Sequence, residues 1–228
     1  GLVGVGHVGH AVIEAIRPLG VQILLNDPPQ KEALRKAGKP HEFFLKMEEL
    51  QEKCDIISFH TPLITKGPYP TFHLANKTFF NALKKQPIII NTSRGAVVDN
   101  TDVLQALKDG IIRDAIIDTW ENEPNINQEL LNLIYIGTPH IAGYSADGKA
   151  NATRMALTAL CNHFHLPVTF QIRVPQLPEE ELPEPNLTET ERALVLYNPH
   201  TDSLKLKSHP TMFEELRGNY PLRREFIE

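Results

Sequence analysis

Residues 1–27 read GLVGVGHVGHAVIEAIRPLGVQILLND, and this stretch decides the fold. Gly4, Gly6 and Gly9 stand in the spacing G-x-G-x-x-G directly after a short apolar run, and a second apolar run ends at Asp27. Glycines in this spacing let a strand turn tightly into a helix, so that backbone N–H groups can approach a pyrophosphate. An acid at the end of the next strand accepts hydrogen bonds from the adenosine ribose. The stretch therefore predicts a strand–helix–strand unit that binds a dinucleotide.

The bulk properties fit a globular protein with a small-molecule ligand. The chain has 228 residues, 41% of them hydrophobic, and a formal net charge of −5, which argues against nucleic-acid binding. No apolar run approaches the roughly 18 residues of a membrane span. Cys54 and Cys161 are not in a C-x-x-C spacing and lie among apolar residues, which indicates buried free thiols and a cytoplasmic location. Gly1 already lies in the first predicted strand without an initiator methionine, so we expect the numbering to begin inside a longer protein.

Short apolar runs alternate with amphipathic stretches over residues 1–140. The runs expected to form strands are Leu2–Val5, Val21–Asn26, Asp55–Phe59, Pro87–Asn91, Asp114–Asp118 and Tyr135–Gly137. Helices are expected between them, for example at Gly9–Ile16 and Thr101–Lys108. This alternation is typical of an α/β fold with a doubly wound parallel sheet of the Rossmann type. Such a sheet binds its ligand at the carboxyl ends of the strands.

The second half of the chain changes in composition. We expect a Rossmann domain over residues 1–165 that ends in a long helix at Ala146–His165. Residues 166–187 are rich in proline and glutamate and predict a linker, with one strand at Val168–Val174. In residues 188–228 the runs ALVLYNP and SLKLK suggest a hairpin before a helix, which makes a small α+β segment. That segment is too small for a core of its own, so we expect an incomplete dimerisation domain.

Three charged residues follow consecutive predicted strands: Arg94, Glu123 and His140. Oxidation of a secondary alcohol needs a base for the hydroxyl proton, and histidine suits this role near neutral pH. Arginine can hold a substrate carboxylate through its two-pronged guanidinium group, and a glutamate beside the histidine fixes its tautomer. Each residue alone has a simpler explanation, as an ion pair, a turn cap or surface polarity. Their joint position after a nucleotide-binding turn favours catalysis.

Four motifs together resemble the D-isomer-specific 2-hydroxyacid dehydrogenase family. They are GVGHVG at residues 4–9, RGAVVD at 94–99, DTWENEP at 118–124 and PHIAG at 139–143. The resemblance implies NAD as cofactor and assigns Arg94, Glu123 and His140 as the substrate arginine, the partner glutamate and the acid/base histidine. GPYPT at 67–71 and the tail LRGNYPLRREF resemble a branch that oxidises a phosphorylated 2-hydroxy acid. The alternatives are a phosphoglycerate, glycerate or lactate enzyme, and an NAD-binding module without turnover.

The resemblance also implies further site residues. The residues expected to contact the cofactor are Gly4, Gly6, His7, Val8, Gly9, Asp27, Thr61, Thr92, Ser93, Arg94, Asp118 and Gly143. Tyr144 is expected to reach the substrate together with Arg94, although it could equally be a packing residue, and Asp118 could equally cap nearby N–H groups. His163 and His165 are interpreted as the end of the long helix, and no metal site is expected.

Two departures from the family pattern affect these expectations. His7 stands where the family more often has asparagine or arginine. The substrate domain that precedes the glycine turn in the family is absent from this sequence, and we expect it to supply the phosphate-binding residues. The resemblance further implies a homodimer formed through the C-terminal segment.

Overall fold

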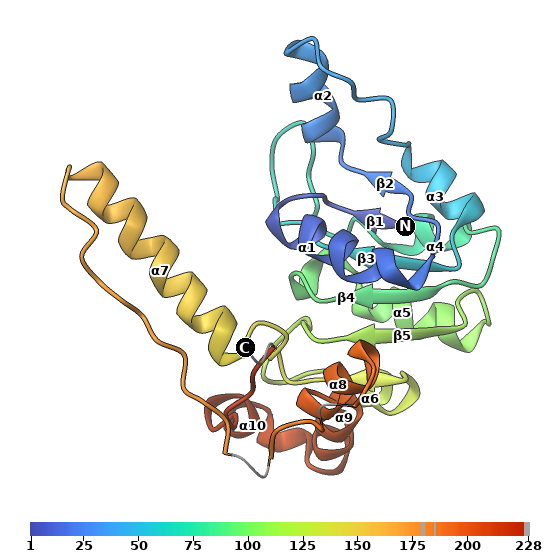
Figure 1. Ribbon diagram of the computed structural model, residues 1–228. Coiled ribbons are helices and arrows are strands. Elements are labelled where there is room, and N and C mark those ends of the chain that lie inside the picture. The colour runs from blue at the N-terminus through green and yellow to red at the C-terminus, as the bar shows by residue number, and fades with distance from the viewer. Residues whose placement is uncertain (179–180, 185, 226–228) are drawn as a thin grey trace.

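Six short parallel strands form one sheet in the computed structural model, which describes residues 1–178, 181–184 and 186–225 (Figure 1). The strands are β1 (Leu2–Val3), β2 (Leu25–Asn26), β3 (Ile56–Phe59), β4 (Ile88–Asn91), β5 (Asp114–Ile117) and β6 (Ile136–Gly137). Their order is β2-β1-β3-β4-β5-β6, and all neighbouring pairs are parallel. The predicted doubly wound sheet is confirmed, with every strand at its expected place and most of them shorter.

The chain reverses its direction of travel across the sheet between β1 and β3. It leaves β1 to add β2 on one side and returns to add β3 on the other side. Outside β2, Phe44 makes one further parallel bridge with Leu25. Ligands of such sheets bind where the direction reverses, beyond the carboxyl ends of the strands. The glycine turn after β1 lies at this point.

Helices connect the strands. In chain order they are α1 (His7–Ile16), α2 (Pro28–Lys36), α3 (Met47–Lys53), α4 (Lys77–Asn81), α5 (Asn100–Lys108) and α6 (Gln128–Leu133), with 3₁₀ turns η1 (Arg17–Leu19) and η2 (Gly95–Val97). Asp27 and Asp99 cap α2 and α5 by accepting hydrogen bonds from backbone N–H groups of the first turn. These two acids therefore fix where their helices begin.

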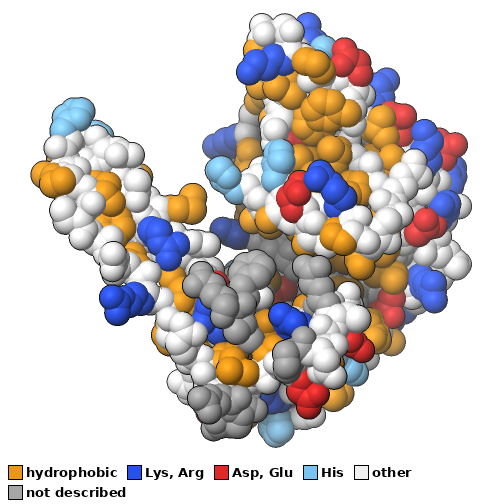
Figure 2. All heavy atoms as spheres, in the orientation of Figure 1, with side chains coloured by type: hydrophobic (Ala, Val, Ile, Leu, Met, Phe, Trp, Pro, Cys, Tyr) orange, Lys and Arg blue, Asp and Glu red, His pale blue; other side chains and the backbone are white. Residues whose placement is uncertain are grey.

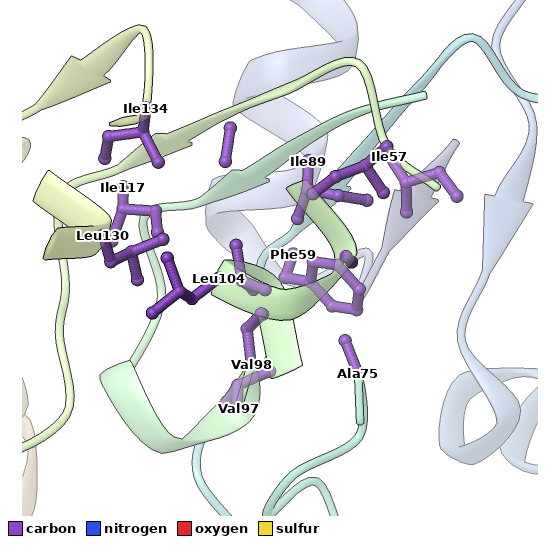
Figure 3. Close-up of a cluster of buried hydrophobic side chains, with 14 of the residues drawn as sticks. Ile57, Phe59, Ala75, Ile89, Val97, Val98, Leu104, Ile117, Leu130 and Ile134 are labelled. Atoms are coloured by element: carbon purple, nitrogen blue, oxygen red, sulfur yellow. The ribbon is translucent and has the colours of Figure 1, made fainter. Parts of the chain in front are cut away.

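One contiguous apolar core lies against the sheet and fixes the strand ends (Figure 3). Ile57, Ile89 and Ile117 from three neighbouring strands are fully buried, and Leu104 of α5 and Leu130 of α6 pack against the same cluster. Truncating one such side chain to alanine typically costs about 2–5 kcal/mol of stability. The core thus gives the loops at the carboxyl edge a rigid support.

The C-terminal part is helical, so the predicted α+β segment is wrong in its strands. It consists of α7 (Ala146–His163), α8 (Glu189–Leu196), α9 (Pro199–Ser208), the turn η4 (Pro210–Met212) and α10 (Phe213–Gly218). Ala193–Leu196 of the first run lie in α8, its Pro199 begins α9, and SLKLK lies in α9. Thr188 and Glu191 form a capping box at the start of α8, and Asn198 caps α9 ahead of Pro199. These start signals outweigh the alternating apolar pattern.

The segment at 166–187 contains no strand in its described part, so the expected strand at Val168–Val174 is also wrong; residues 179, 180 and 185 lie outside the described residues. α7 projects from the rest of the molecule in Figure 1, and in Figure 2 apolar side chains lie along this arm. Met155, Leu160 and Phe164 are among its exposed residues. α9 packs beside β6, where the Ser203 hydroxyl accepts a hydrogen bond from the Gly137 N–H.

Cys54 is buried, as expected, whereas Cys161 on α7 is only half-buried; both are free thiols. Within the described residues, no helix is long and apolar enough to cross a membrane.

Candidate active site

The predicted site residues lie beyond the carboxyl ends of the six strands, in the loops that follow them and, for His7, Val8 and Gly9, in the first turn of α1. The glycine turn follows β1, Asp27 follows β2 and Thr61 follows β3. Arg94, Glu123 and His140 follow β4, β5 and β6, which are neighbours in the sheet. The strand order therefore divides the edge into a nucleotide half, after β1, β2 and β3, and a half after β4, β5 and β6 that carries Arg94, Glu123 and His140.

The glycine turn has the backbone that its sequence predicts. Gly4 has a φ of +90°, and a Cβ there would lie 2.7 Å from the carbonyl oxygen of His60. A Cβ at Gly9 would collide with the carbonyl of Gly4, so α1 can lie close to β1 only with glycine there. A Cβ at Gly6 would meet open space. His7 and Val8 begin α1 and are exposed, which leaves their backbone accessible to a pyrophosphate.

A cavity of about 820 Å³ lies beside this turn. Its walls come from Gly4 and Gly6, from Asp27 and the start of α2, and from residues 60–71. Tyr69 of the GPYPT segment donates from its hydroxyl to Glu32 on α2 and so links two walls of the cavity. GPYPT therefore borders the nucleotide half of the edge.

Asp27 is buried at the rim of the cavity and already has local partners. Its carboxylate accepts hydrogen bonds from the backbone N–H groups of Val5 (2.8 Å) and Gln30 (2.9 Å) and from the Gln30 side chain. These contacts fix the carboxylate between the glycine turn and α2. The predicted ribose contact would use this same carboxylate.

Two polar atoms next to the cavity are buried without a hydrogen-bond partner among the described residues. They are Oγ1 of Thr61 and Nδ1 of His60. His60 meets Ser58 Oγ through its other nitrogen at 2.9 Å, and burial lowers the pKa of its imidazole. Buried polar groups usually have partners, so two unpartnered ones beside a large cavity fit a site built for a polar ligand. A dinucleotide fits this cavity and its glycine turn.

The loop after β4 carries Thr92, Ser93 and Arg94. Ser93 is buried and donates from Oγ to the Asn91 side chain, whereas Arg94 is exposed. Arg94 donates from Nη1 to the carbonyl of Ser93 and forms no ion pair within the described part of the chain. Its guanidinium remains available for a substrate carboxylate.

Glu123 and His140 form the pair that the sequence predicts. Nδ1 of His140 lies 2.8 Å from Oε2 of Glu123, and Oε1 of Glu123 accepts a hydrogen bond from the Trp120 N–H at 2.8 Å. Burial opposes ionisation of Glu123, but the hydrogen bonds from His140 and Trp120 outweigh it and lower the pKa of the carboxyl. The ionised Glu123 thus orients the imidazole through Nδ1 and leaves Nε2 for another partner.

Asp118 and Tyr144 have local partners. These partners fit the alternative interpretations, in which Asp118 caps nearby N–H groups and Tyr144 is a packing residue. The Asp118 carboxylate accepts hydrogen bonds from the Thr138 hydroxyl and from the N–H groups of Ile141 and Ala142. Burial raises the pKa of Asp118 despite these bonds. Tyr144 packs edge-to-face on Tyr220. Gly143, next to Tyr144, is exposed and has open space at its Cα.

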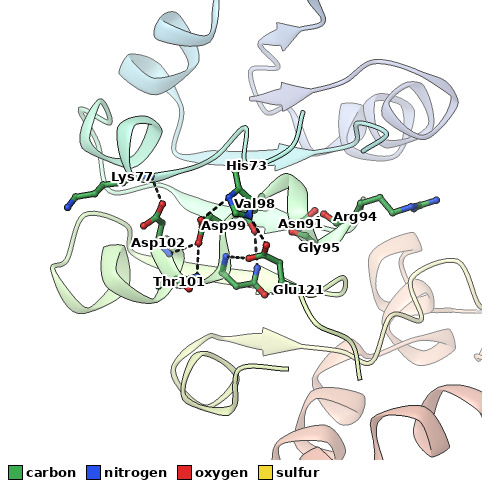
Figure 4. Close-up of polar contacts among 11 residues, drawn as sticks. His73, Lys77, Asn91, Arg94, Gly95, Val98, Asp99, Thr101, Asp102 and Glu121 are labelled. Carbon is green, nitrogen blue, oxygen red and sulfur yellow. Dashed lines mark hydrogen bonds and ion pairs between the residues drawn. The ribbon is translucent and has the colours of Figure 1, made fainter. Parts of the chain in front are cut away.

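His73 joins the loops that follow β4 and β5, a role that the sequence did not predict (Figure 4). Its Nδ1 lies 3.0 Å from Oδ2 of Asp99 and its Nε2 lies 2.6 Å from Oε1 of Glu121. Asp99 follows Arg94 by five residues and Glu121 precedes Glu123 by two. A Cβ at Gly95 would collide with the Trp120 carbonyl, so the two loops touch directly. In Figure 4 the Arg94 side chain points away from this cluster.

Residues 1–142 match the family described as D-isomer specific 2-hydroxyacid dehydrogenase, NAD binding domain. The chain belongs to this family. Its residues 1–142 therefore form an NAD-binding domain, which agrees with the cavity and the glycine turn described above.

Similar proteins carry one repeated name. The erythronate-4-phosphate dehydrogenase of Bacteroides thetaiotaomicron is 52% identical over 225 residues, which cover 99% of this chain and 63% of that protein. The protein of that name from Escherichia coli O157:H7 is 38% identical and is covered over 61% of its length. The chain thus spans less than two thirds of these 2-hydroxyacid dehydrogenase relatives.

Solved structures of the family share the fold. The D-lactate dehydrogenase of Aquifex aeolicus, solved with NAD and lactic acid, superposes with a TM-score of 0.57 at 26% identity over 72% of this chain and 52% of that one. A Lactobacillus delbrueckii D-isomer specific 2-hydroxyacid dehydrogenase in its NAD complex gives 0.56 at 26% identity, over 74% of this chain and 53% of that one.

Proposed function

We propose that the protein to which this chain belongs oxidises 4-phospho-D-erythronate at C2, with NAD as hydride acceptor. The product is 2-oxo-3-hydroxy-4-phosphobutanoate, a step that belongs to pyridoxal 5′-phosphate synthesis. The observation that carries the proposal is the 2.8 Å contact between His140 and Glu123 at the carboxyl edge of an NAD-binding domain. The 52% identity to an erythronate-4-phosphate dehydrogenase supports the choice of substrate.

His140 is the proposed general base. Because Nδ1 faces Glu123, Nε2 is the nitrogen that can take the proton of the C2 hydroxyl. The carboxylate of Glu123 then stabilises the imidazolium that forms. Bound NAD supplies the hydride acceptor, so no metal is needed for the oxidation.

Arg94 is the proposed substrate-binding residue. Its exposed guanidinium can pair with the substrate carboxylate through two parallel hydrogen bonds and can polarise the carbonyl that develops at C2. The loop contacts around His73 hold Arg94 on the same edge as Glu123. Holding the substrate and the cofactor in the correct relative position accounts for much of the rate enhancement in such reactions.

We also propose that the protein is a homodimer formed partly through residues 188–228. In this segment Leu206 and Phe213 are buried against the Rossmann domain. Leu194 and Val195 of α8 remain exposed, which supports a further contact there.

A turnover panel tests the proposed substrate. The full-length protein is assayed for NADH formation with 4-phospho-D-erythronate, 3-phosphoglycerate, D-glycerate and D-lactate. The highest kcat/KM is expected for 4-phospho-D-erythronate. Higher kcat/KM for one of the other acids would reassign the substrate. NAD binding without turnover of any of them would favour the non-catalytic alternative.

A further inference from the structure

Two cationic side chains flank the ring of Tyr144, beyond the residues assigned to the reaction. Nζ of Lys149 lies 4.4 Å from the ring centroid, and Cζ of Arg217 lies 5.7 Å from it. Lys149 comes from the start of α7 and Arg217 from α10. Two separate parts of the chain, residues 144–149 and α10, therefore bring a phenol, an ammonium and a guanidinium group together.

The backbone of Tyr144 belongs to the turn that follows His140. The Tyr144 N–H donates to the Ile141 carbonyl at 2.9 Å, so the chain folds back in a turn directly after His140. The Cα atoms at the two ends of such a turn are usually less than about 7 Å apart. Tyr144 therefore lies on the same loop as His140, one turn further along the chain.

Arg217 has unused hydrogen-bonding capacity. Its Nε is buried and has no hydrogen-bond partner in the described part of the chain. Among the described residues, its one ion pair joins Nη1 to Oε1 of Glu214 at 3.9 Å, and the Glu214 side chain is 61% exposed. An exposed pair at that distance holds a guanidinium only weakly. Lys149 forms no ion pair with any described residue.

The acids near this cluster have other partners. Asp147 pairs with Arg224 at 2.9 Å, and Glu225 accepts a hydrogen bond from the Ser145 hydroxyl. Asp202 accepts one from the Tyr220 hydroxyl. The positive charge of Lys149 and Arg217 is therefore left available to an anion.

The positive charge of Arg217 acts on the carboxyl group of Glu123. Burial alone would raise the pKa of this carboxyl, but hydrogen bonds from His140 and Trp120 lower it, and the positive charge of Arg217 adds to the lowering. Arg217 therefore lies on the catalytic side of the molecule.

We propose that Tyr144, Lys149 and Arg217 form a subsite that binds the phosphate group of the substrate. The inference rests on the proposed function, because it assigns the far end of the same molecule. A phosphate dianion can accept hydrogen bonds from the guanidinium, the ammonium and the phenol together, and such charge-assisted bonds are the strong ones. The subsite places a phosphate contact within this chain.

The experiment compares two substrates in the full-length protein. Arg217→Met and Lys149→Met are assayed with 4-phospho-D-erythronate and with unphosphorylated D-erythronate. Binding of inorganic phosphate to the NAD-loaded protein is measured by calorimetry beside the assays. Arg17→Met and Lys85→Met, on exposed surfaces elsewhere, are the matched controls. Arg217→Lys keeps the charge and guards against a loss that comes only from packing.

Each cluster variant is expected to raise KM for the phosphorylated substrate by about 10- to 100-fold, the size of a lost hydrogen bond to a charged group. For Lys149→Met, kcat/KM for D-erythronate should stay at the wild-type value. For Arg217→Met, which also removes a charge that acts on Glu123, the loss on D-erythronate should be smaller than the loss on the phosphorylated substrate. The phosphate affinity of both variants should fall, and Arg217→Lys should retain most of the wild-type phosphate affinity. Equal losses on both substrates, or an unchanged KM for the phosphorylated one, would overturn the subsite. If wild type does not oxidise 4-phospho-D-erythronate, the proposed function fails, and the phosphate titration still decides the subsite. Phosphate affinity equal in wild type and variants would then refute it.

Discussion

Arg223 donates from Nη2 to the backbone carbonyl of Ala142 at 2.8 Å, and the same nitrogen lies 3.0 Å from the carbonyl of Ile141. Arg223 is almost fully buried, and its guanidinium lies 4.0 Å from the Tyr197 ring centroid. The N–H groups of Ile141 and Ala142 donate on their other side to Asp118. The loop that begins at His140 is therefore held between β5 and the C-terminal tail.

Replacing Arg223 with a shorter side chain should impair catalysis more than cofactor binding. Arg223→Lys loses the two-acceptor geometry of the guanidinium, and kcat is expected to fall by about 10- to 100-fold because the His140 loop is misplaced. Steady-state kinetics and an NAD titration on the full-length protein measure the two effects, with exposed Arg113→Lys as control. A variant that loses thermal stability but keeps its kcat would give Arg223 a purely structural role.

Asp27 should make the protein prefer NAD over NADP. A 2′-phosphate would meet its buried carboxylate, and nearby Lys31 already donates from Nζ to the Phe44 carbonyl. Wild type is expected to bind NAD at least about tenfold more tightly, since placing like charges together costs several kcal/mol. In Asp27→Asn the asparagine can still cap α2. This variant should bind NADP more tightly than wild type does, so its affinities for NAD and NADP should differ by less. Equal affinities in wild type would remove the role given to Asp27.

Glu123 should make folding stability depend on pH in the acid range. Burial opposes its ionisation, yet the bonds from His140 and Trp120 lower its pKa below the ordinary 4.5. A carboxyl whose pKa is lower in the folded state stabilises the fold above its unfolded pKa, and this contribution is lost as pH falls through the folded value. The free energy of unfolding, measured with urea between pH 7 and pH 3, should therefore fall less steeply with pH in Glu123→Gln than in wild type.

The matched control for this experiment is Glu129→Gln, whose exposed carboxylate pairs with Lys108 on the surface. Its stability should follow the wild-type pH dependence. A Glu123→Gln curve parallel to wild type would show that the His140 contact contributes nothing to stability.

The proposed homodimer can be tested on the exposed face of α8. Leu194 and Val195 are 54% and 55% exposed, and a glutamate at either position would place a charge in an apolar contact. Light scattering is expected to give a dimer for the full-length wild type and a weakened dimer for Leu194→Glu and Val195→Glu. Leu19→Glu, at an exposed residue of η1, is the control. A wild-type monomer would contradict the proposal, as would dimers that both α8 variants leave intact.

The sequence predicts well where local patterns act alone. The apolar runs and the glycine spacing were enough to place all six strands and the turn at Gly4–Gly9. The Glu123–His140 contact also followed from strand order, because neighbouring parallel strands bring their next loops together. Asp118 shows the limit, since residue type alone could not decide between a cofactor contact and capping of local N–H groups.

The errors and omissions have physical causes. In α8 and α9 the alternation of leucines suggested strands, but Thr188, Glu191, Asn198 and Pro199 are helix start signals. Arg223 contacts residues 81 and 82 positions earlier in the chain, and no local pattern reports such a contact. His73 has the same difficulty, because its partners belong to two later loops.

The central claim is that this NAD-binding domain carries its acid/base residue on the loop after β6. His140→Ala in the full-length protein tests it most directly, with NAD affinity measured by calorimetry and NADH formation measured with 4-phospho-D-erythronate. We predict unchanged NAD affinity and a loss of about 10²–10⁴-fold in kcat, the usual contribution of general acid/base catalysis. Turnover near the wild-type rate in His140→Ala would contradict the account.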